Sequence, residues 1–517
     1  MKTNILLLLL CLTSGLFAQN TPPQILNLHA SFSYTDNQLT VSYDLTDAEG
    51  DSVEIFFRLS NNAGDTYLVD VSTAAGDVGF PVTPGTGKQI IWHAPQPIST
   101  VLARVKLVAD DREEIDIQSI VDQADSLRLK NDLSWIEGIR HSTAGLAHLQ
   151  AVKDSVENRF IAAGLTTYRQ PLTFGNYTLE NIIGLHLGHV DDTKTWILDG
   201  HVDGVFNSPA ADDNGSAVAG MLEAVRLMAP LYFKNNLRFI GFDQEEPGTL
   251  GSQLYVNQGI QSWETIQGVV NLEMIGYFDQ APNTQVFPAG FNLLFPTAYN
   301  EVVADSSRGN FITNVADGNS TLLKQKFDSC AAKYVPDLRV ITLTAPNNPA
   351  LVPDLLRSDH AWFWATGIPA LMITDGANFR NFNYHTSGDS IGTLNFTFML
   401  QVVKASIATL MELAGPIHGD VAISEVGIMN TGIRDLASLC NILVTETESG
   451  IRIETGDCGK YEMTASIVNI TGQYIAEIQT LPGQRNIYFP TTSFSPGIYL
   501  LKLENHAGVY SAKILIR

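Results

Sequence analysis

The residues with the clearest chemical meaning are two adjacent glutamates, Glu245 and Glu246, in the stretch GFDQEEPGTLGS (241–252). An apolar run, LRFIGF, leads into this pair and a Pro-Gly turn follows it. Carboxylates at the end of a buried strand lose water, and neighbouring negative charges repel each other, so such a pair is costly unless something offsets its charge. The pair therefore indicates a site at which charge is neutralised.

More imidazole and carboxylate groups follow other short apolar runs. They are His201 and Asp203 after TWILDG, Asp212, Asp213 and Asn214 in AADDNGSA, Glu273 at the end of GVVNL, and His385 and Asp389 after PALMITD. Continuous apolar runs that alternate with helical stretches predict a mainly parallel sheet covered by helices on both faces. Functional groups collect beyond the carboxyl ends of such strands. A helix cap or a structural histidine explains any one of these four groups, but together with the glutamate pair they make five on one edge, which predicts a functional site.

The residue types favour a divalent metal. Asp213, Glu246 and Glu273 supply three negative charges, while His201 and His385 are neutral as ligands, so one divalent ion leaves the group at minus one and two leave it at plus one. Mixed imidazole and carboxylate ligation suits zinc, and also cobalt or manganese. Two ions about 3.5–4 Å apart can activate water and hold both the attacking and the leaving atom.

The elements that position these groups occupy the middle of a chain of 517 residues, a length that suits two to four domains. Residues 20–110 contain short alternating stretches such as QLTVSYDL and SVEIFFRLS, which predict an Ig-like β-sandwich. Residues 115–415 carry the helical spacing, the apolar runs and every candidate site residue. Residues 425–517 alternate again and predict a C-terminal β-sandwich.

An acidic turn, DAEGD, joins two of the predicted N-terminal strands. Asp47, Glu49 and Asp51 are conceivable calcium ligands, but no longer loop motif supports an ion there. We therefore interpret the segment as a polar hairpin turn.

The first 18 residues have the layout of a signal peptide, with one lysine, an apolar core and the small residue Ala18 before Gln19. A buried N-terminal helix is the alternative. No later stretch of about 18 apolar residues is evident, so no membrane span is predicted. The net charge of −23 argues against nucleic acid and anionic membranes as partners. If Cys11 leaves with the signal, Cys440 and Cys458 can pair, and Cys330 is expected to be an ordinary buried thiol.

Six segments, in chain order, resemble the co-catalytic zinc aminopeptidases of the bacterial leucyl aminopeptidase type. These segments are DGHVDG, AADDNGSA, FDQEEPGTLGS, VNLEMIGY, RSDHAWFWATGIPAL and YHTSGDS. Glutaminyl cyclases, zinc carboxypeptidase-like proteins and transferrin-receptor-like proteins belong to the same family. The resemblance spans roughly residues 115–415 and implies the zinc exopeptidase fold, an α/β fold with a mainly parallel mixed sheet and helices on both faces.

The resemblance also implies a role for each site residue. His201 and Glu273 would bind the first of two zinc ions, Glu246 and His385 the second, Asp213 would bridge them, Glu245 would be the general base, and Asp203 would orient His201. Neighbouring residues of an extended segment point opposite ways, so Glu245 and Glu246 are expected to face different partners.

Two positions depart from the family pattern. Relatives often carry aspartate where this chain has Glu273, which puts the position of the first metal in doubt. Some relatives have a tyrosine just before the SDH segment, whereas this chain reads PDLLRSDH, so Arg357, Ser358 and His360 are the candidate replacements. We interpret Asp359 and His360 as a supporting or packing pair.

The C-terminal pieces NITGQYI, SPGIYLLKL and SAKILIR resemble the sorting domains of the type IX secretion system. A plain β-sandwich that binds surfaces or carbohydrate is the alternative. With the signal peptide, the resemblance implies export through the periplasm to a secreted or cell-surface location, handled by the type IX machinery. The enzyme is then expected to be a zinc aminopeptidase acting on peptides with a free N-terminus. A glutaminyl cyclase and a catalytically inactive surface binding protein remain the rival hypotheses.

Overall fold

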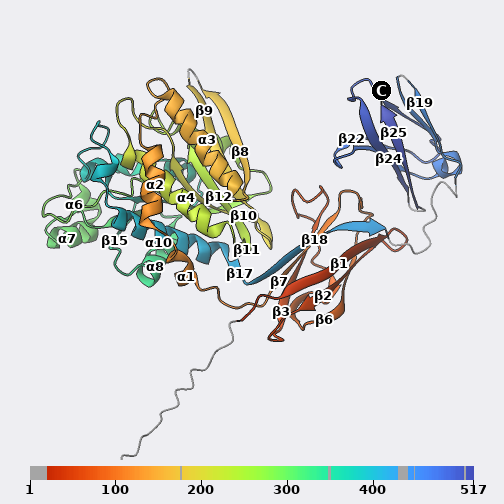
Figure 1. Ribbon diagram of the computed structural model, residues 1–517, viewed down its shortest axis with the longest axis horizontal. Coiled ribbons are helices and arrows are strands. Elements are labelled where there is room, and N and C mark those ends of the chain that lie inside the picture. Colours follow the sequence, from red (N-terminus) through yellow and green to blue (C-terminus); the bar gives the residue numbers. More distant parts are fainter. Residues whose placement is uncertain are drawn as a thin grey trace, which may run out of the picture. The chain divides into compact units, whose positions relative to one another are not determined.

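Apolar runs in the middle of the sequence form the core strands of an eight-stranded mixed sheet in the computed structural model (Figure 1). The structure describes residues 20–174, 177–346, 351–428, 440–447, 449–505 and 508–516, so the predicted signal peptide lies outside the described residues. The chain divides into two units. One unit consists of Arg58–Val69 and Glu114–Ile417, and the other contains the N-terminal and C-terminal β-regions.

The strand order of the central sheet is β15-β14-β16-β13-β10-β12-β9-β8. Parallel pairing joins β10 (Asp191–His201), β12 (Asn235–Phe242), β13 (Thr265–Glu273) and β16 (Ala370–Thr374), and also β14 (Ile312–Ala316) with β15 (Val340–Thr344). Antiparallel pairing joins β14 to β16, β9 (Tyr177–His186) to β12, and β8 (Thr166–Phe174) to β9. The predicted mainly parallel mixed sheet is therefore confirmed.

Both faces of this sheet are buried. Leu198 of β10 belongs to a core with helical residues such as Phe160 and Val403, whereas its neighbour Ile197 packs in a second core with Phe363. Successive side chains of a strand point to opposite faces, so a strand covered on both faces must be apolar at nearly every position. This requirement explains the continuous apolar runs of the sequence.

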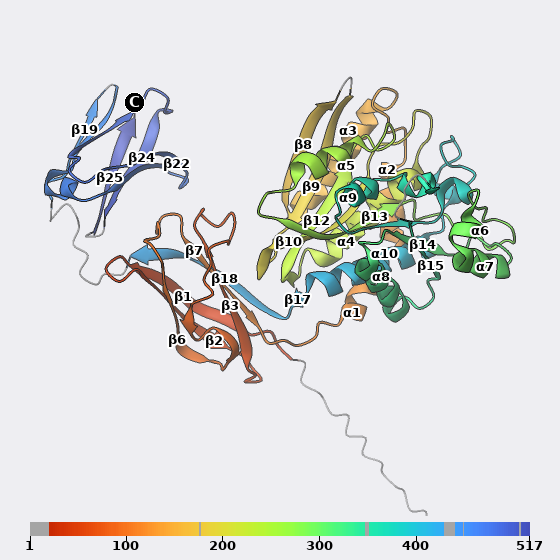
Figure 2. The ribbon, with the colours of Figure 1, turned by 180° about the vertical axis from the view of Figure 1, so that it is seen from behind.

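Helices lie on both sides of the sheet (Figures 1 and 2). They are α1 (Ile117–Val121), α2 (Ser126–Ile136), α3 (Leu146–Ala162), α4 (Ala217–Met228), α5 (Leu250–Leu254), α6 (Phe291–Leu294), α7 (Pro296–Ala304), α8 (Thr321–Tyr334), α9 (His360–Ala365) and α10 (Phe396–Ala414). Of the described helices, α10 has the length and composition of a membrane span, although no span was predicted from the sequence. Most of it is buried, and Met399, Val403 and Ile407 belong to the core.

The N-terminal β-domain takes one strand from a distant part of the chain. Its strands are β1 (Gln24–Ser33), β2 (Gln38–Thr46), β3 (Val53–Ser60), β4 (Ala75–Gly76), β5 (Gly79–Val82), β6 (Gly85–His93), β7 (Arg104–Asp110) and β18 (Gly419–Ile428). β18 pairs parallel with β1 and antiparallel with β7. The expected boundary at residue 425 therefore falls inside a strand of this domain.

The acidic turn is not a hairpin. β2 pairs with β1 and β6, whereas β3 pairs with β5, so DAEGD links strands that are not neighbours. Asp47 Oδ1 accepts the backbone N–H of Asp51 at 2.8 Å, which closes the turn within itself.

The C-terminal region contains two β-sheets. β20 (Gly450–Glu454) lies between β19 (Leu443–Thr447) and β23 (Asn486–Pro490), and the other sheet has the order β22 (Tyr474–Gln479), β21 (Thr464–Asn469), β24 (Gly497–Asn505), β25 (Gly508–Ile516). Ile453, Phe489 and Leu501 share one core. A disulfide joins Cys440 to Cys458, a pairing that the sequence left open, and Cys330 is a buried free thiol, as predicted.

Candidate metal and catalytic site

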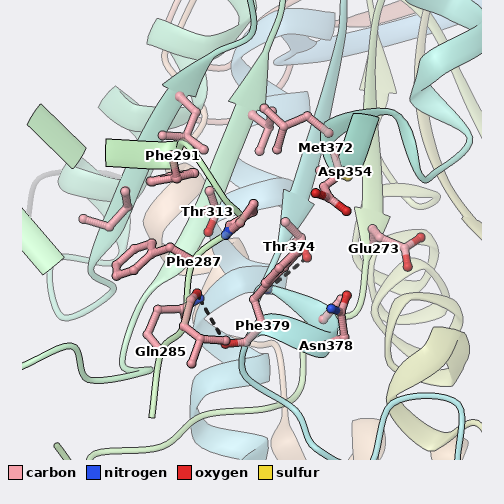
Figure 3. A pocket seen from close by; sticks show the side chains of 18 of the residues that line it. Glu273, Gln285, Phe287, Phe291, Thr313, Asp354, Met372, Thr374, Asn378 and Phe379 are labelled. Carbon is pink, nitrogen blue, oxygen red and sulfur yellow. Dashed lines mark hydrogen bonds between the residues drawn. The ribbon is translucent and has the colours of Figure 1, made fainter. Parts of the chain in front are cut away.

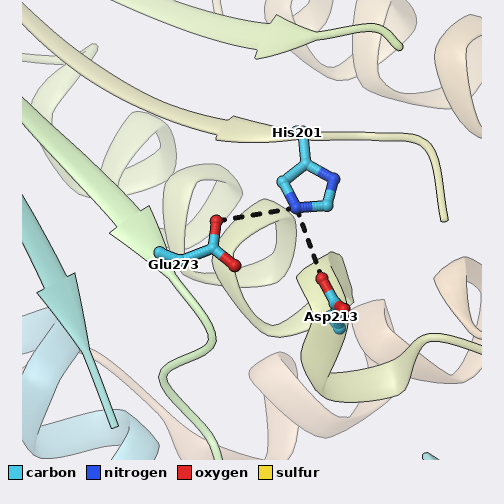
Figure 4. A group of neighbouring side chains, drawn as sticks. All are labelled: His201, Asp213 and Glu273. Atoms are coloured by element: carbon cyan, nitrogen blue, oxygen red, sulfur yellow. Dashed lines mark ion pairs between the residues drawn. The ribbon is translucent and has the colours of Figure 1, made fainter. Parts of the chain in front are cut away.

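Two groups of potential metal ligands meet beyond the carboxyl ends of the central strands. His201 ends β10, Glu273 ends β13, and Asp213 lies in the helical turn η1 (Ala211–Ser216) before α4. These three side chains converge from different elements (Figure 4). The second group contains Asp213 again, with Glu246 and His385. All five predicted ligands are thus brought together, and Asp213 is common to both groups.

The contacts within each group are short. His201 Nε2 lies 3.4 Å from Asp213 Oδ1 and 3.6 Å from Glu273 Oε2. His385 Nε2 lies 3.1 Å from Asp213 Oδ2 and 3.1 Å from Glu246 Oε2. The two Asp213 oxygens therefore face different imidazoles, as a carboxylate shared between two cations would.

The donor atoms fit metal ions. His201 Nε2, Asp213 Oδ2, Glu246 Oε1 and His385 Nε2 are buried and have no hydrogen-bond partner among the described residues. Buried polar atoms are normally hydrogen-bonded, so four unsatisfied atoms in one place need an explanation. Imidazole nitrogen and carboxylate oxygen are ligands that zinc accepts, and one cation in each group would together satisfy all four atoms.

Electrostatics support a cation site. Burial lowers the pKa of His201, but the nearby carboxylates, with Glu245 the largest contributor, outweigh burial and raise that pKa well above its usual range. Burial also lowers the pKa of His385, yet Asp213 and Glu246 raise it to about 9. Burial and the charge of Asp213 raise the pKa of Glu246 to about 7. The clustered carboxylates favour protonation of His201, His385 and Glu246, and a bound cation would replace those protons.

Glu245 lies beside the first group but belongs to neither group. Its Oε2 atom lies 3.9 Å from His201 Nε2, and burial raises its pKa well above the ordinary value. Asp203 fixes the backbone of the glutamate pair. Its carboxylate accepts hydrogen bonds from the N–H groups of Glu245 at 3.0 Å and Glu246 at 3.2 Å. Asp203 Oδ1 also lies 3.5 Å from His201 Nδ1. One carboxylate thus holds the glutamate pair and lies against His201.

The expected extended geometry at the pair is wrong. β12 ends at Phe242, and Gln244 has a φ of 58°, so the chain turns before it reaches the glutamates. Glu245 O accepts the N–H groups of Gly248 and Thr249, which closes a second turn that begins at Glu245 itself. The two side chains do contact different histidines, as expected. They diverge because the chain turns at this point, and not because side chains alternate along an extended strand.

Further carboxylates and hydroxyls hold the ligands in place. Asp389 accepts the backbone N–H groups of Asp212 at 2.9 Å and Asp213 at 3.1 Å, which fixes the loop of the shared ligand. The Ser358 hydroxyl lies 2.7 Å from Glu273 Oε2 and 2.8 Å from Asn271 Oδ1. The longer side chain at position 273 is therefore held by a hydrogen bond. Partners of this kind fix the orientation of metal ligands.

Arg140, a fully buried residue, was not among the site residues predicted from the sequence. Its guanidinium donates to the carbonyls of Val202 and Ala210, at 2.8 Å each, and so ties together the loops that carry His201 and Asp213. Its partners are backbone atoms, which leave no signal in the local sequence.

The pair Asp359 and His360 has a mainly structural setting. His360 Nε2 lies 2.9 Å from Leu355 O, its ring packs edge-on against Trp364, and burial lowers its pKa to about 4. Asp359 is fully buried, and burial raises its pKa to about 7. The packing interpretation of His360 is confirmed.

Comparisons with known proteins assign the family. The model of peptidase family M28 matches residues 181–410, and that of the secretion system C-terminal sorting domain matches residues 447–517. The uncharacterized protein YfbL of Escherichia coli K12 is 30% identical over 285 residues, covering 52% of this chain and 82% of that protein. Leucine aminopeptidase 1 of Ajellomyces capsulatus is 28% identical over 236 residues, covering 43% of this chain and 53% of that protein.

Among solved structures, the LapA aminopeptidase of Legionella pneumophila aligns with a TM-score of 0.46 at 19% identity, covering 59% of this chain and 78% of that chain. The chain spans about half the length of the leucine aminopeptidase it matches and most of YfbL. The stretch of this chain that the family model matches contains every residue of both ligand groups. The chain belongs to peptidase family M28 and ends in a secretion system C-terminal sorting domain.

Proposed function

We propose that this chain is an exported, two-zinc aminopeptidase that releases N-terminal residues from peptides. The observation that carries the proposal is the pair of ligand groups that share Asp213, with the free carboxylate of Glu245 beside them. His201 and Glu273 would hold one zinc, Glu246 and His385 the other, and Asp213 both. Zinc bound there would polarise the scissile carbonyl and make water more acidic.

Glu245 would act as the general base. Its carboxylate would take a proton from the attacking water and return it to the leaving nitrogen as the C–N bond breaks. Desolvation of Glu245 raises its pKa, which favours a carboxylate that accepts and returns a proton. Asp203 would set the position of Glu245 through the backbone hydrogen bond between them.

An apolar cavity next to Glu273 supports a preference for large apolar N-terminal residues (Figure 3). Together with the solvent at its mouth, it contains about 780 Å³ not filled by protein atoms. Much of its wall consists of Phe287, Phe291, Phe311, Val315, Leu343 and Met372. Glu273 is a proposed zinc ligand and also lines this cavity. When the scissile bond of a peptide lies at the metals, its N-terminal side chain could therefore enter the cavity.

We therefore expect kcat/KM for leucine or phenylalanine amides to exceed that for alanine amide by about tenfold or more, since each buried methylene is worth roughly 1–3 kcal/mol in such a pocket. Rates with a panel of single-residue amides measure this preference. Equal rates for all residues would show that the cavity does not take the side chain.

One incubation separates the proposal from its rivals. Leu-, Ala- and Gln-peptides are mixed with the protein, and the products are identified by mass spectrometry. Release of the first residue supports the aminopeptidase, whereas cyclisation of N-terminal glutamine without release identifies a glutaminyl cyclase. No reaction, combined with no bound metal by elemental analysis, identifies a binding protein.

The sorting domain gives a separate prediction. We expect deletion of residues 430–517 to leave the enzyme in the periplasm with its peptidase activity intact. The deletion begins after Ile428 because β18 is a strand of the N-terminal β-domain. Fractionation and activity assays of the periplasm and the medium provide the measurement. Normal secretion of the truncated chain would contradict the sorting role, and a control deletion that begins at residue 419 should destabilise the N-terminal β-domain.

A further inference from the structure

The segment before the SDH motif borders two hollows of the peptidase domain. This segment includes the helical turn η4 (Pro353–Leu356). Leu355 lines the apolar cavity beside Glu273, whereas Val352 and Leu356 line a separate groove. The groove, counted with the solvent at its mouth, has a volume of about 1350 Å³. One short segment is thus a wall of both the cavity and the groove.

The wall of the groove is mainly apolar. It consists of Ala345, Pro346, Val352, Leu356, Ala361, Trp362, Trp364 and Ala365, with Thr249, Asp317 and Asn319 as the polar members. Both indoles are half-buried and held by hydrogen bonds. Trp362 Nε1 donates to Thr249 Oγ1 at 2.8 Å, and Trp364 Nε1 donates to Ala370 O at 2.9 Å. Because these N–H groups are used within the protein, the indoles offer the groove carbon surface, which favours apolar side chains.

The groove adjoins the turn that begins at Glu245. The N–H group of Thr249 donates to Glu245 O at 2.6 Å, and the hydroxyl of the same threonine accepts the indole N–H of Trp362. Glu245 would return its proton to the leaving nitrogen, so the departing part of the substrate begins beside this residue. The first side chain would instead enter the cavity beside Glu273. A peptide that crosses the metal site from the cavity would therefore continue toward the groove.

Charge also decides what the groove can hold. Asp317 is the one charged residue among the described residues that line it, and no cation lies among them. A free carboxylate in the groove would find no partner there and would be repelled by Asp317. Internal residues of a peptide carry no terminal charge. The groove thus suits the residues that follow the first one in a longer chain, and not the C-terminus of a dipeptide.

We propose that the groove binds the second and third residues of a peptide substrate and selects apolar side chains there; this proposal rests on the proposed aminopeptidase function. Trp362 and Leu356 determine the selectivity, because Trp362 contacts the turn of Glu245 and Leu356 belongs to the wall shared with the cavity. The substrates that suit the enzyme are then apolar peptides of three or more residues, and not single-residue amides.

Two peptide amides test this selectivity, Leu-Phe-Phe-amide and Leu-Ser-Ser-amide. They share the N-terminal residue, and the terminal amide removes the carboxylate that the groove disfavours. We expect kcat/KM for release of leucine to be about tenfold or more higher for the phenylalanine peptide, because a phenylalanine side chain gains from burial and a serine side chain does not. Mass spectrometry of the released leucine gives both rates.

Trp362→Ser and Leu356→Ser test the two residues that determine the selectivity. Each variant should lower the ratio of the two kcat/KM values by about threefold or more, because it removes apolar surface from the groove. The ratio is the readout, since any disturbance of the Glu245 turn slows both peptides alike and leaves their ratio unchanged. Leu127→Ser is the matched control, because Leu127 lies on α2, is 61% exposed and lines neither the groove nor the cavity. It should keep the wild-type ratio.

Equal kcat/KM values for the two peptides in the wild type would overturn the proposal, while release of ammonia from leucine amide would leave the aminopeptidase function standing. A wild-type preference that persists in both variants would also overturn it, because the selection would then occur outside the groove. If the wild type hydrolyses none of these substrates, the aminopeptidase function fails and this proposal fails with it.

Discussion

We expect the Glu245→Gln enzyme to keep all of its zinc and to turn over about 10²–10⁴-fold more slowly than the wild type. Glutamine has nearly the same size as glutamate but cannot take the proton of the attacking water. Glu245 belongs to neither ligand group, so its replacement removes no metal ligand. Its backbone N–H still reaches Asp203, which keeps the turn in place. Steady-state kinetics on leucine amide and elemental analysis of the same sample provide the measurement.

Glu246→Gln is the matched control, because it makes the same change one residue away. Glu246 shares the second group with Asp213 and His385, so this variant should lose metal first and activity with it. If Glu245→Gln loses zinc while Glu246→Gln keeps it, the two roles are reversed. If both variants retain activity, the active site lies elsewhere.

The positions of His201 and Glu273 are examples of what the sequence pattern can predict. Each is the last residue of a strand whose apolar run is continuous, because both faces of that strand are buried. Parallel strands bring their carboxyl ends to one edge, so polar residues that follow such runs meet there. The sheet and the meeting of the ligands at its edge can therefore be predicted from local sequence alone.

Other features depend on contacts that local sequence does not encode. β18 pairs with β1 although Ala30 and its partner Val426 lie far apart in the sequence, and nothing in the residues of β18 specifies that partner. The turn at Gln244 has a positive φ at a residue that rarely adopts it, so an extended strand end was the natural expectation. Tyr384 directly precedes His385, and only the structure shows that its hydroxyl meets Arg357.

Removal of the metal should abolish turnover, and Asp213→Asn should have the same effect by releasing both ions. Asp213 is common to both ligand groups, and its two oxygens face His201 and His385 separately. Asparagine keeps the shape but removes the negative charge and one of the two oxygen ligands. Because Asp213 belongs to both ligand groups, loss of its negative charge weakens the binding of both cations. Glu273→Gln and Glu246→Gln should each weaken one ion only.

Zinc per chain after dialysis, measured with activity, distinguishes these cases. The wild type should lose activity in excess chelator and regain it with zinc or cobalt. Asp122→Asn is the matched control, because Asp122 has a side chain 55% exposed, pairs with Lys404 and takes no part in either ligand group. It should retain both ions and full activity. Full wild-type activity after long incubation with chelator would rule out the metal mechanism. An Asp213→Asn enzyme that keeps two zinc ions would instead show that the ions are held independently, so that each group must complete its coordination without the shared carboxylate.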